Sequence, residues 1–161
     1  MFTTRPEILG TFGVVTSTHW LASAAGMSLL ERGGNAFDAC AASAFVLQVV
    51  EPHLVGPAGE VPAVFYSART GQVEVLCGQG TTPAAATLER YRAEGLKLIP
   101  GNGLLATVIP GAFDAWMLLL RDHGTMRVRD VLEPAIYYAE HGHALMPVSY
   151  THLTLPTTPY V

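Results

Sequence analysis

The sequence is poor in charge. Only 14% of its 161 residues are charged, whereas 50% are hydrophobic, and the formal net charge is -4. No cluster of Lys and Arg is present, so the composition gives no reason to expect nucleic acid as a partner. A chain of this length and hydrophobicity is not intrinsically disordered, and it is long enough for one domain with a sizeable core.

The sequence also lacks a long apolar run. The longest, residues 39–50, is too short to cross a bilayer and contains Ser43 and Gln48. The first seven residues have no apolar core like that of a signal peptide. We therefore expect no membrane association and a cytoplasmic location, which an N-terminal extension would change to periplasmic or secreted.

Cysteine is scarce. Cys40 and Cys77 have no metal-ligand spacing and form no disulfide framework. Cys40 falls within the apolar run, where a free thiol is expected to be a buried, inert hydrophobe. His141 and His143 could hold a metal ion, but no third ligand is evident, so a cationic helix end is the favoured interpretation. We predict no metal and no cofactor.

What the sequence does contain is a strong joint between two helices, GGNAFDA at residues 33–39. Gly33 or Gly34 can take the positive φ that ends a helix over residues 21–32. Asn35 can cap the next helix, and Asp38 suits the positive end of its dipole. That next helix, residues 36–50, is apolar on all sides and should be buried on all sides.

The remaining chain predicts a mixture of short strands and helices. The first helix should follow a buried strand at residues 13–17, with Ser17 or Thr18 as its cap and with His19 and Trp20 packing at its start. Further along we expect a hairpin of residues 63–68 and 72–77, and then a helix at 88–94 capped by Thr87. A strand at 104–109 should precede a helix from 111 to about 121. The core stripe of that helix should be Phe113, Trp116, Met117 and Leu120. A last helix over residues 128–140 should be divided near Pro134.

The chain changes character near Val148. The last segment is rich in threonine and has no Asp, Glu, Lys or Arg in its first ten residues. It resembles a translated sequencing-library adapter, and the alternative is an ordinary loop-like C-terminus. We expect residues 1–147 to be authentic and residues 148–161 to be derived from the adapter, so that the natural chain continues beyond residue 147.

Five segments in consistent order resemble the γ-glutamyltransferase family, at the start of its large subunit. GGNAFDA is similar to the family's GGNAxDA, and VVEPH at residues 49–53 precedes a glycine-rich loop as it does there. TPAAAT at 82–87, IPG at 109–111 and LEPAI at 132–136 resemble APAAAT, VPG and LEPAI. The resemblance covers residues 13–147.

This resemblance implies an α+β N-terminal-nucleophile hydrolase, an αββα four-layer sandwich of which the chain holds an incomplete N-terminal portion. Such enzymes are precursors that cleave themselves, and the new N-terminal threonine of the small subunit attacks a γ-glutamyl amide such as that of glutathione. The implied partners are a small-molecule γ-glutamyl or related acyl amide and the missing C-terminal half of the same precursor.

Two departures from the family matter. The nucleophilic threonine lies beyond residue 147, so the chain has no catalytic residue and should be inactive alone. The family's substrate-binding arginine, in a DGRExAP-type segment, aligns with Gln79 in CGQGTTP. An arginine pairs bidentately with a carboxylate, whereas glutamine does not, and the loss would weaken substrate binding by about 1–3 kcal/mol.

The leading hypothesis is therefore a fragment of a γ-glutamyl amide hydrolase or transferase from a divergent branch of the family. Gln79 keeps a second hypothesis open, an acylase of the same fold acting on glutaryl or cephalosporin-type substrates. A third is a non-catalytic partner subunit.

Overall fold

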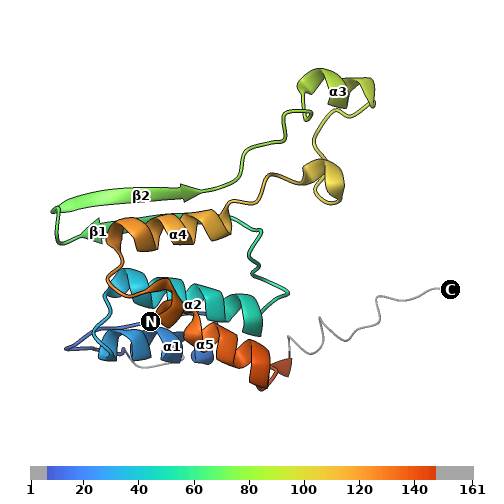
Figure 1. Cartoon of the computed structure of the whole chain (residues 1–161). Coiled ribbons are helices and arrows are strands. Elements are labelled where there is room, and N and C mark those ends of the chain that lie inside the picture. Colours follow the sequence, from blue (N-terminus) through green and yellow to red (C-terminus); the bar gives the residue numbers. More distant parts are fainter. Residues whose placement is uncertain (1–6, 148–161) are drawn as a thin grey trace. The chain divides into compact units, whose positions relative to one another are not determined.

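The computed structural model describes residues 7–147, and the predicted adapter-derived tail lies outside them. In chain order the elements are α1 (Trp20–Glu31), α2 (Ala36–Val50), β1 (Val61–Ser67), β2 (Gln72–Gly78), α3 (Leu88–Ala93), the 3-10 turn η1 (Leu104–Ala106), α4 (Ala112–His123) and α5 (Val128–His141) (Figure 1). They form two compact units, one of residues 56–118 and one of residues 7–55 together with 119–147. The predicted mixture of helices and a hairpin is thus confirmed.

The joint at residues 33–39 is built as its sequence predicts. Gly33 ends α1 with a φ of 91°, a conformation that favours glycine. The Asn35 side chain accepts the backbone N–H groups of Phe37 and Asp38 at 2.9 and 3.0 Å. Asp38 in turn accepts the Asn35 N–H at 2.9 Å, which completes a reciprocal capping box.

Helix α2 is the centre of the first unit, where it packs against α1 and α5 (Figure 1). Small residues allow a close approach to α1. The Ser43 hydroxyl donates to the Ala22 carbonyl at 2.9 Å, and a Cβ on Gly26 would collide with that hydroxyl. Cys40 is an exception to the predicted burial, since it is exposed on α2. It shares its face with exposed Ala36, one turn earlier.

Three predictions in the first unit are wrong. Residues 13–17 form no strand, because within residues 7–147 no other strand pairs with them, and they alternate between exposed and half-buried. The cap of α1 is His19, whose Nδ1 accepts the Leu21 N–H, and not Ser17 or Thr18. Helix α5 is not divided at Pro134, because buried Val131 and Ala135 pack on both sides of it.

The second unit contains a β-hairpin. Strands β1 and β2 are antiparallel, and the register pairs Val61 with Gly78 and Ser67 with Gln72. Pairs Val64–Val75 and Tyr66–Val73 form one face, on which all four side chains are between 63% and 73% exposed. The hairpin therefore presents an apolar face that nothing in the described chain buries.

The segment after the hairpin departs from prediction at one strand. Thr87 caps α3 through its hydroxyl, as predicted. The predicted strand at 104–109 is instead the turn η1 followed by extended chain, in which the Ile109 N–H donates to the Thr81 carbonyl at 2.9 Å. Without a continuous partner strand, an apolar run such as this forms no ladder.

Helix α4 begins after Pro110-Gly111 and ends before Gly124, as the sequence predicts. Its buried side chains are Ala112, Ala115, Trp116, Leu119 and Leu120. Phe113 was expected in this stripe but is 52% exposed, because it lies at the edge of the helix face centred on Ala112 and Leu119.

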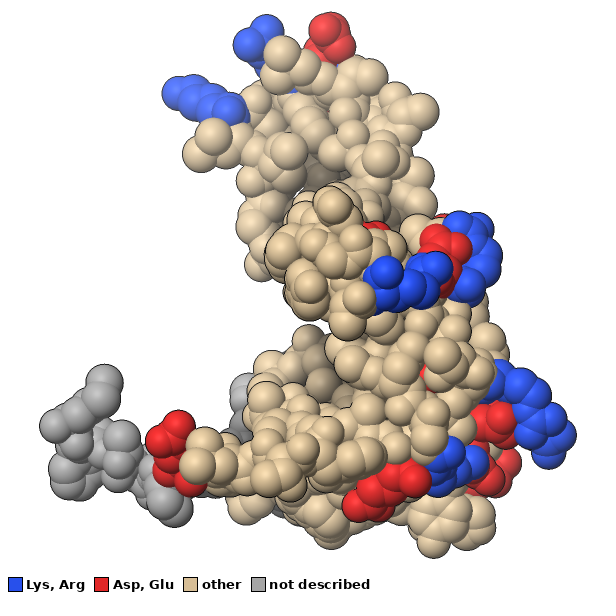
Figure 2. All heavy atoms as spheres, turned by 90° about the vertical axis from the view of Figure 1, so that its left-hand side faces the viewer, with Lys and Arg blue, Asp and Glu red and all other residues tan. Residues whose placement is uncertain are grey.

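The surface shows no segregation of charge in the view of Figure 2, where acidic and basic side chains lie interspersed among uncharged residues. Among residues 7–147 no helix is both long and apolar enough to cross a membrane.

Candidate functional site

The residue singled out by the sequence, Gln79, lies at the edge of a pocket in the second unit. It directly follows β2, and the pocket occupies the space between the end of β2 and the start of α4. Its volume is about 230 Å³, and its lining residues are Leu76, Cys77, Gly78, Gln79, Gly80, Pro110, Gly111, Asp114, Ala115 and Leu118.

Glycines bring the walls of this pocket together. A Cβ on Gly78 would collide with that of Ala115, and a Cβ on Gly111 would lie 2.5 Å from the Gly78 carbonyl oxygen. The backbone N–H groups of Gly111 and Ala112 both donate to Gly59 O, at 3.3 and 2.9 Å. The start of α4 is therefore fastened to the chain just before β1.

Two carboxylates lie at or beside the pocket, those of Asp114 and Glu60. Gln79 donates from Nε2 to Glu60 Oε2 at 2.9 Å, and its Oε1 lies 3.9 Å from Cys77 Sγ. Asp114, in the first turn of α4, contributes a second carboxylate. Neither Glu60 nor Asp114 was predicted from the sequence. The hairpin register carried one step past Val61–Gly78 places Glu60 opposite Gln79, and that register is the signal that could have found it.

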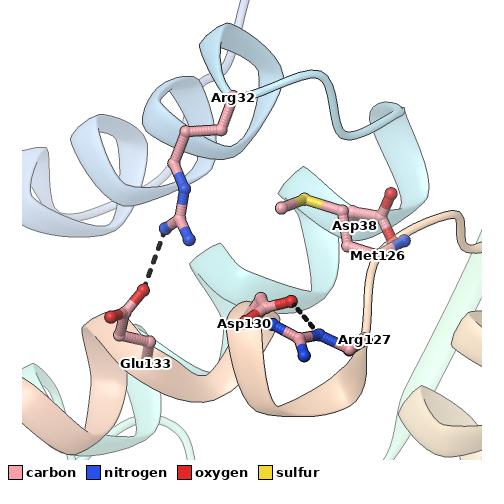
Figure 3. A network of polar contacts seen from close by, with 6 residues as sticks. All are labelled: Arg32, Asp38, Met126, Arg127, Asp130 and Glu133. Atoms are coloured by element: carbon pink, nitrogen blue, oxygen red, sulfur yellow. Dashed lines mark hydrogen bonds and ion pairs between the residues drawn. The ribbon is translucent and has the colours of Figure 1, made fainter.

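A second polar centre, in the first unit, is organised by Asp38, which is fully buried. Its carboxylate accepts the N–H and hydroxyl of Thr125 and the N–H of Met126, besides that of Asn35. The Asn35 amide meanwhile donates to the His123 carbonyl at 2.6 Å. The GGNAFDA joint thus fixes the loop between α4 and α5 (Figure 3).

Ion pairs at the surface surround this centre. Arg32, just after α1, pairs with Glu133 of α5 at 3.0 Å, and Arg127 pairs with Asp130 at 2.8 Å (Figure 3). Both pairs are accessible to solvent, so each contributes little to stability. The buried Asp38 carboxylate, and not these pairs, dominates the stability of the joint. We assign it a structural role.

His19 is the third notable polar residue. It is 1% exposed, and its Nδ1 accepts the Leu21 N–H at 3.2 Å, so the neutral ring carries its proton on Nε2. Burial lowers the pKa of His19, an effect that nearby Glu51 opposes and His143 reinforces. The predicted packing role at the helix start is confirmed. Trp20 is instead 62% exposed.

No group of three or more His, Cys, Asp or Glu side chains in residues 7–147 is arranged to hold a metal ion. The Nδ1–H of His141 donates to the Tyr137 carbonyl at 3.0 Å, and the His141 ring stacks on the Tyr137 ring. The helix end that carries it is closed by Gly142 with a φ of 80°.

The sequence model of gamma-glutamyltranspeptidase matches residues 22–157. The chain belongs to the gamma-glutamyltranspeptidase family. It is 36% identical over 160 residues to the glutathione hydrolase-like YwrD proenzyme of Bacillus subtilis (strain 168), across 96% of this chain and 30% of that relative. It is also 37% identical over 147 residues to the Acylase ACY 1 proenzyme of Pseudomonas sp. (strain SE83), across 86% of this chain and 26% of that relative.

Solved structures of this family show the same fold. The gamma-glutamyltranspeptidase of Helicobacter pylori aligns with a TM-score of 0.82 and 32% identity, over 92% of this chain and 43% of that one. LmbA2991HD aligns with a TM-score of 0.82 and 64% identity, over 90% of this chain and 25% of that one. The predicted N-terminal-nucleophile hydrolase fold is confirmed, and the chain corresponds to the N-terminal part of the large subunit.

The chain spans less than a third of the curated relatives named above, both of which are proenzymes. The relatives place the family among hydrolases and transferases. One of them is named for glutathione hydrolysis and the other for acylase activity.

Proposed function

We propose that the chain is part of a precursor that hydrolyses or transfers the acyl group of γ-glutamyl amides of the glutathione type. The similarity to a glutathione hydrolase-like proenzyme along 96% of the chain is the observation that carries this proposal. The structure supports it, because the joint at residues 33–39 carries a complete capping box and the Asp38 carboxylate accepts hydrogen bonds from the loop at Thr125.

The proposed nucleophile is the hydroxyl of an N-terminal threonine, which the precursor exposes when it cleaves itself. That hydroxyl attacks the amide carbonyl and passes its proton to the threonine's own α-amino group. The amine leaves with a proton, and the resulting ester is resolved by water or by an acceptor amine. The residues of this chain would supply a wall of the acyl-donor site at the Gln79 pocket.

A specific observation favours a second candidate, an acylase of the same fold. Gln79 stands where the family carries its carboxylate-binding arginine, and the chain is 37% identical to an acylase proenzyme. Glutaryl or cephalosporin-type substrates would then replace γ-glutamyl compounds. A non-catalytic partner subunit is the remaining alternative.

One experiment separates these candidates. The precursor that carries this chain is expressed, its self-cleavage is followed by gel electrophoresis and mass spectrometry, and the product is assayed with γ-glutamyl and glutaryl p-nitroanilides. We expect cleavage into two subunits and release of nitroaniline from the γ-glutamyl compound. Turnover of the glutaryl compound alone would favour the acylase. If the precursor shows no cleavage and no turnover, the non-catalytic subunit is the remaining candidate.

A further inference from the structure

Glu60 is held in place beside Gln79 from two sides. The residue after it, Val61, is paired with Gly78 in the hairpin, and the residue before it, Gly59, accepts two N–H groups from the start of α4. Its carboxylate accepts the Gln79 Nε2–H at 2.9 Å. The backbone of Glu60 is therefore fixed on both flanks, opposite Gln79, which directly follows β2.

This contact changes what Gln79 can offer a ligand. One of its two N–H donors is engaged by Glu60, while its Oε1 remains an acceptor. The Glu60 carboxylate lies beside the pocket, hydrogen-bonded to Gln79, and no Lys or Arg is among the described residues that line it. Asp114, which lines the pocket, adds a second carboxylate. A ligand carboxylate bound at Gln79 would therefore be repelled by the carboxylates of Glu60 and Asp114.

We propose that Glu60 makes the Gln79 pocket selective against carboxylates. The preferred acyl donor then carries an uncharged carboxamide or an amine at the place where a γ-glutamyl compound carries its α-carboxylate. Such a group donates N–H bonds to the acceptors of Gln79 and Asp114. This inference rests on the proposed function, because it assigns a specificity to the acyl-donor site of that amide-cleaving enzyme.

The test uses two p-nitroanilides of equal size in the self-cleaved precursor. One is γ-glutamyl p-nitroanilide, and the other is the same compound with its α-carboxylate converted to a carboxamide. We expect kcat/KM to be at least about tenfold higher for the carboxamide. In Glu60→Gln this preference should shrink to about threefold or less, and in Gln79→Arg it should reverse in favour of the carboxylate.

The matched control is Glu31→Gln, which removes one exposed negative charge at the end of α1, a helix of the other unit. This variant should retain the preference of the natural protein. Each variant is checked for complete self-cleavage and an unchanged melting temperature. If Gln79→Arg fails to mature, Glu60→Gln alone still decides the question.

The outcomes are distinguishable. Turnover of both anilides with a preference for the carboxylate in the natural protein overturns the selectivity but leaves the proposed function standing. A preference for the carboxamide that persists unchanged in Glu60→Gln overturns the role of Glu60. Absence of turnover of either compound by a fully cleaved precursor overturns the proposed function and the inference together.

Discussion

Thr125 donates to Asp38 twice, from its backbone N–H at 3.1 Å and from its hydroxyl at 2.7 Å. The two residues are 87 positions apart in the sequence, and Asp38 is fully buried. A buried carboxylate is costly unless its acceptor positions are filled, and here backbone and hydroxyl donors fill them. The α1–α2 joint and the loop after α4 are thereby one structural element.

Asp38→Asn should be strongly destabilising. The amide of asparagine would direct N–H donors at the N–H and hydroxyl donors that now surround the carboxylate, so the free energy of unfolding should fall by about 3 kcal/mol or more. The measurement is thermal or denaturant unfolding of the protein. Asp122→Asn, a change at an exposed carboxylate, should leave the free energy of unfolding nearly unchanged. Equal losses in the two variants would contradict the central role of Asp38.

Gly34→Ala should also destabilise the joint, for a steric reason. A Cβ at Gly34 would lie 2.6 Å from Met126 Sδ and 2.9 Å from the Leu29 carbonyl oxygen. The flexible methionine can move, but the backbone oxygen of α1 cannot, so we expect a loss of about 1–3 kcal/mol. Gly56→Ala is the matched control, since no atom lies within 4 Å of a Cβ there and Gly56 has no positive φ. A neutral Gly34→Ala would show that the joint can open without cost.

Stability should decline on mild acidification because of His19. The folded pKa of His19 is lowered from 6.5, first by burial, with opposition from Glu51 and reinforcement from His143. Below about pH 6.5 the unfolded state therefore binds more protons than the folded state, and stability falls as the pH drops toward the folded pKa. Protonation would also place a proton on Nδ1 and remove the acceptor that caps α1.

The matching measurement is the melting temperature between about pH 7.5 and 5.5. His19→Asn keeps a capping side chain but removes the titration, so its melting temperature should vary less over this interval. His141→Asn, at an exposed helix end, should retain the pH dependence of the natural protein. An identical pH profile in His19→Asn would exclude His19 as its source.

The chain expressed alone should aggregate. Val64, Tyr66, Val73 and Val75 form an exposed apolar face on the hairpin, the kind of surface that promotes association. Replacing all four by Thr should raise the soluble fraction measured by sedimentation or light scattering. Leu76→Thr, on the opposite face of β2 and only 8% exposed, should instead lower stability. A soluble monomer that unfolds cooperatively without any substitution would contradict this expectation.

The sequence singled out Gln79, whose role in substrate binding stays a prediction, but it did not predict the contact between Gln79 and Glu60. A hairpin of residues 63–68 and 72–77 implies a three-residue turn, whereas the structure has a four-residue turn that pairs Ser67 with Gln72. A shift of one residue changes which side chain lies opposite Gln79. The contact with Glu60 therefore depends on a register that short-range turn signals did not fix.

The sequence by itself determined the elements whose causes are local. A glycine with positive φ at residue 33 or 34, the Asn35 cap and the full extent of α2 all follow from neighbouring residues, and the structure chose Gly33. Tertiary structure alone decided what depends on distant partners: that residues 13–17 lack a ladder, that α5 continues through Pro134, that Cys40 is exposed, and that Asp38 holds a loop 87 residues away. The physical reason is that strand pairing, burial and the satisfaction of buried charge are properties of pairs of segments, which local propensity does not encode.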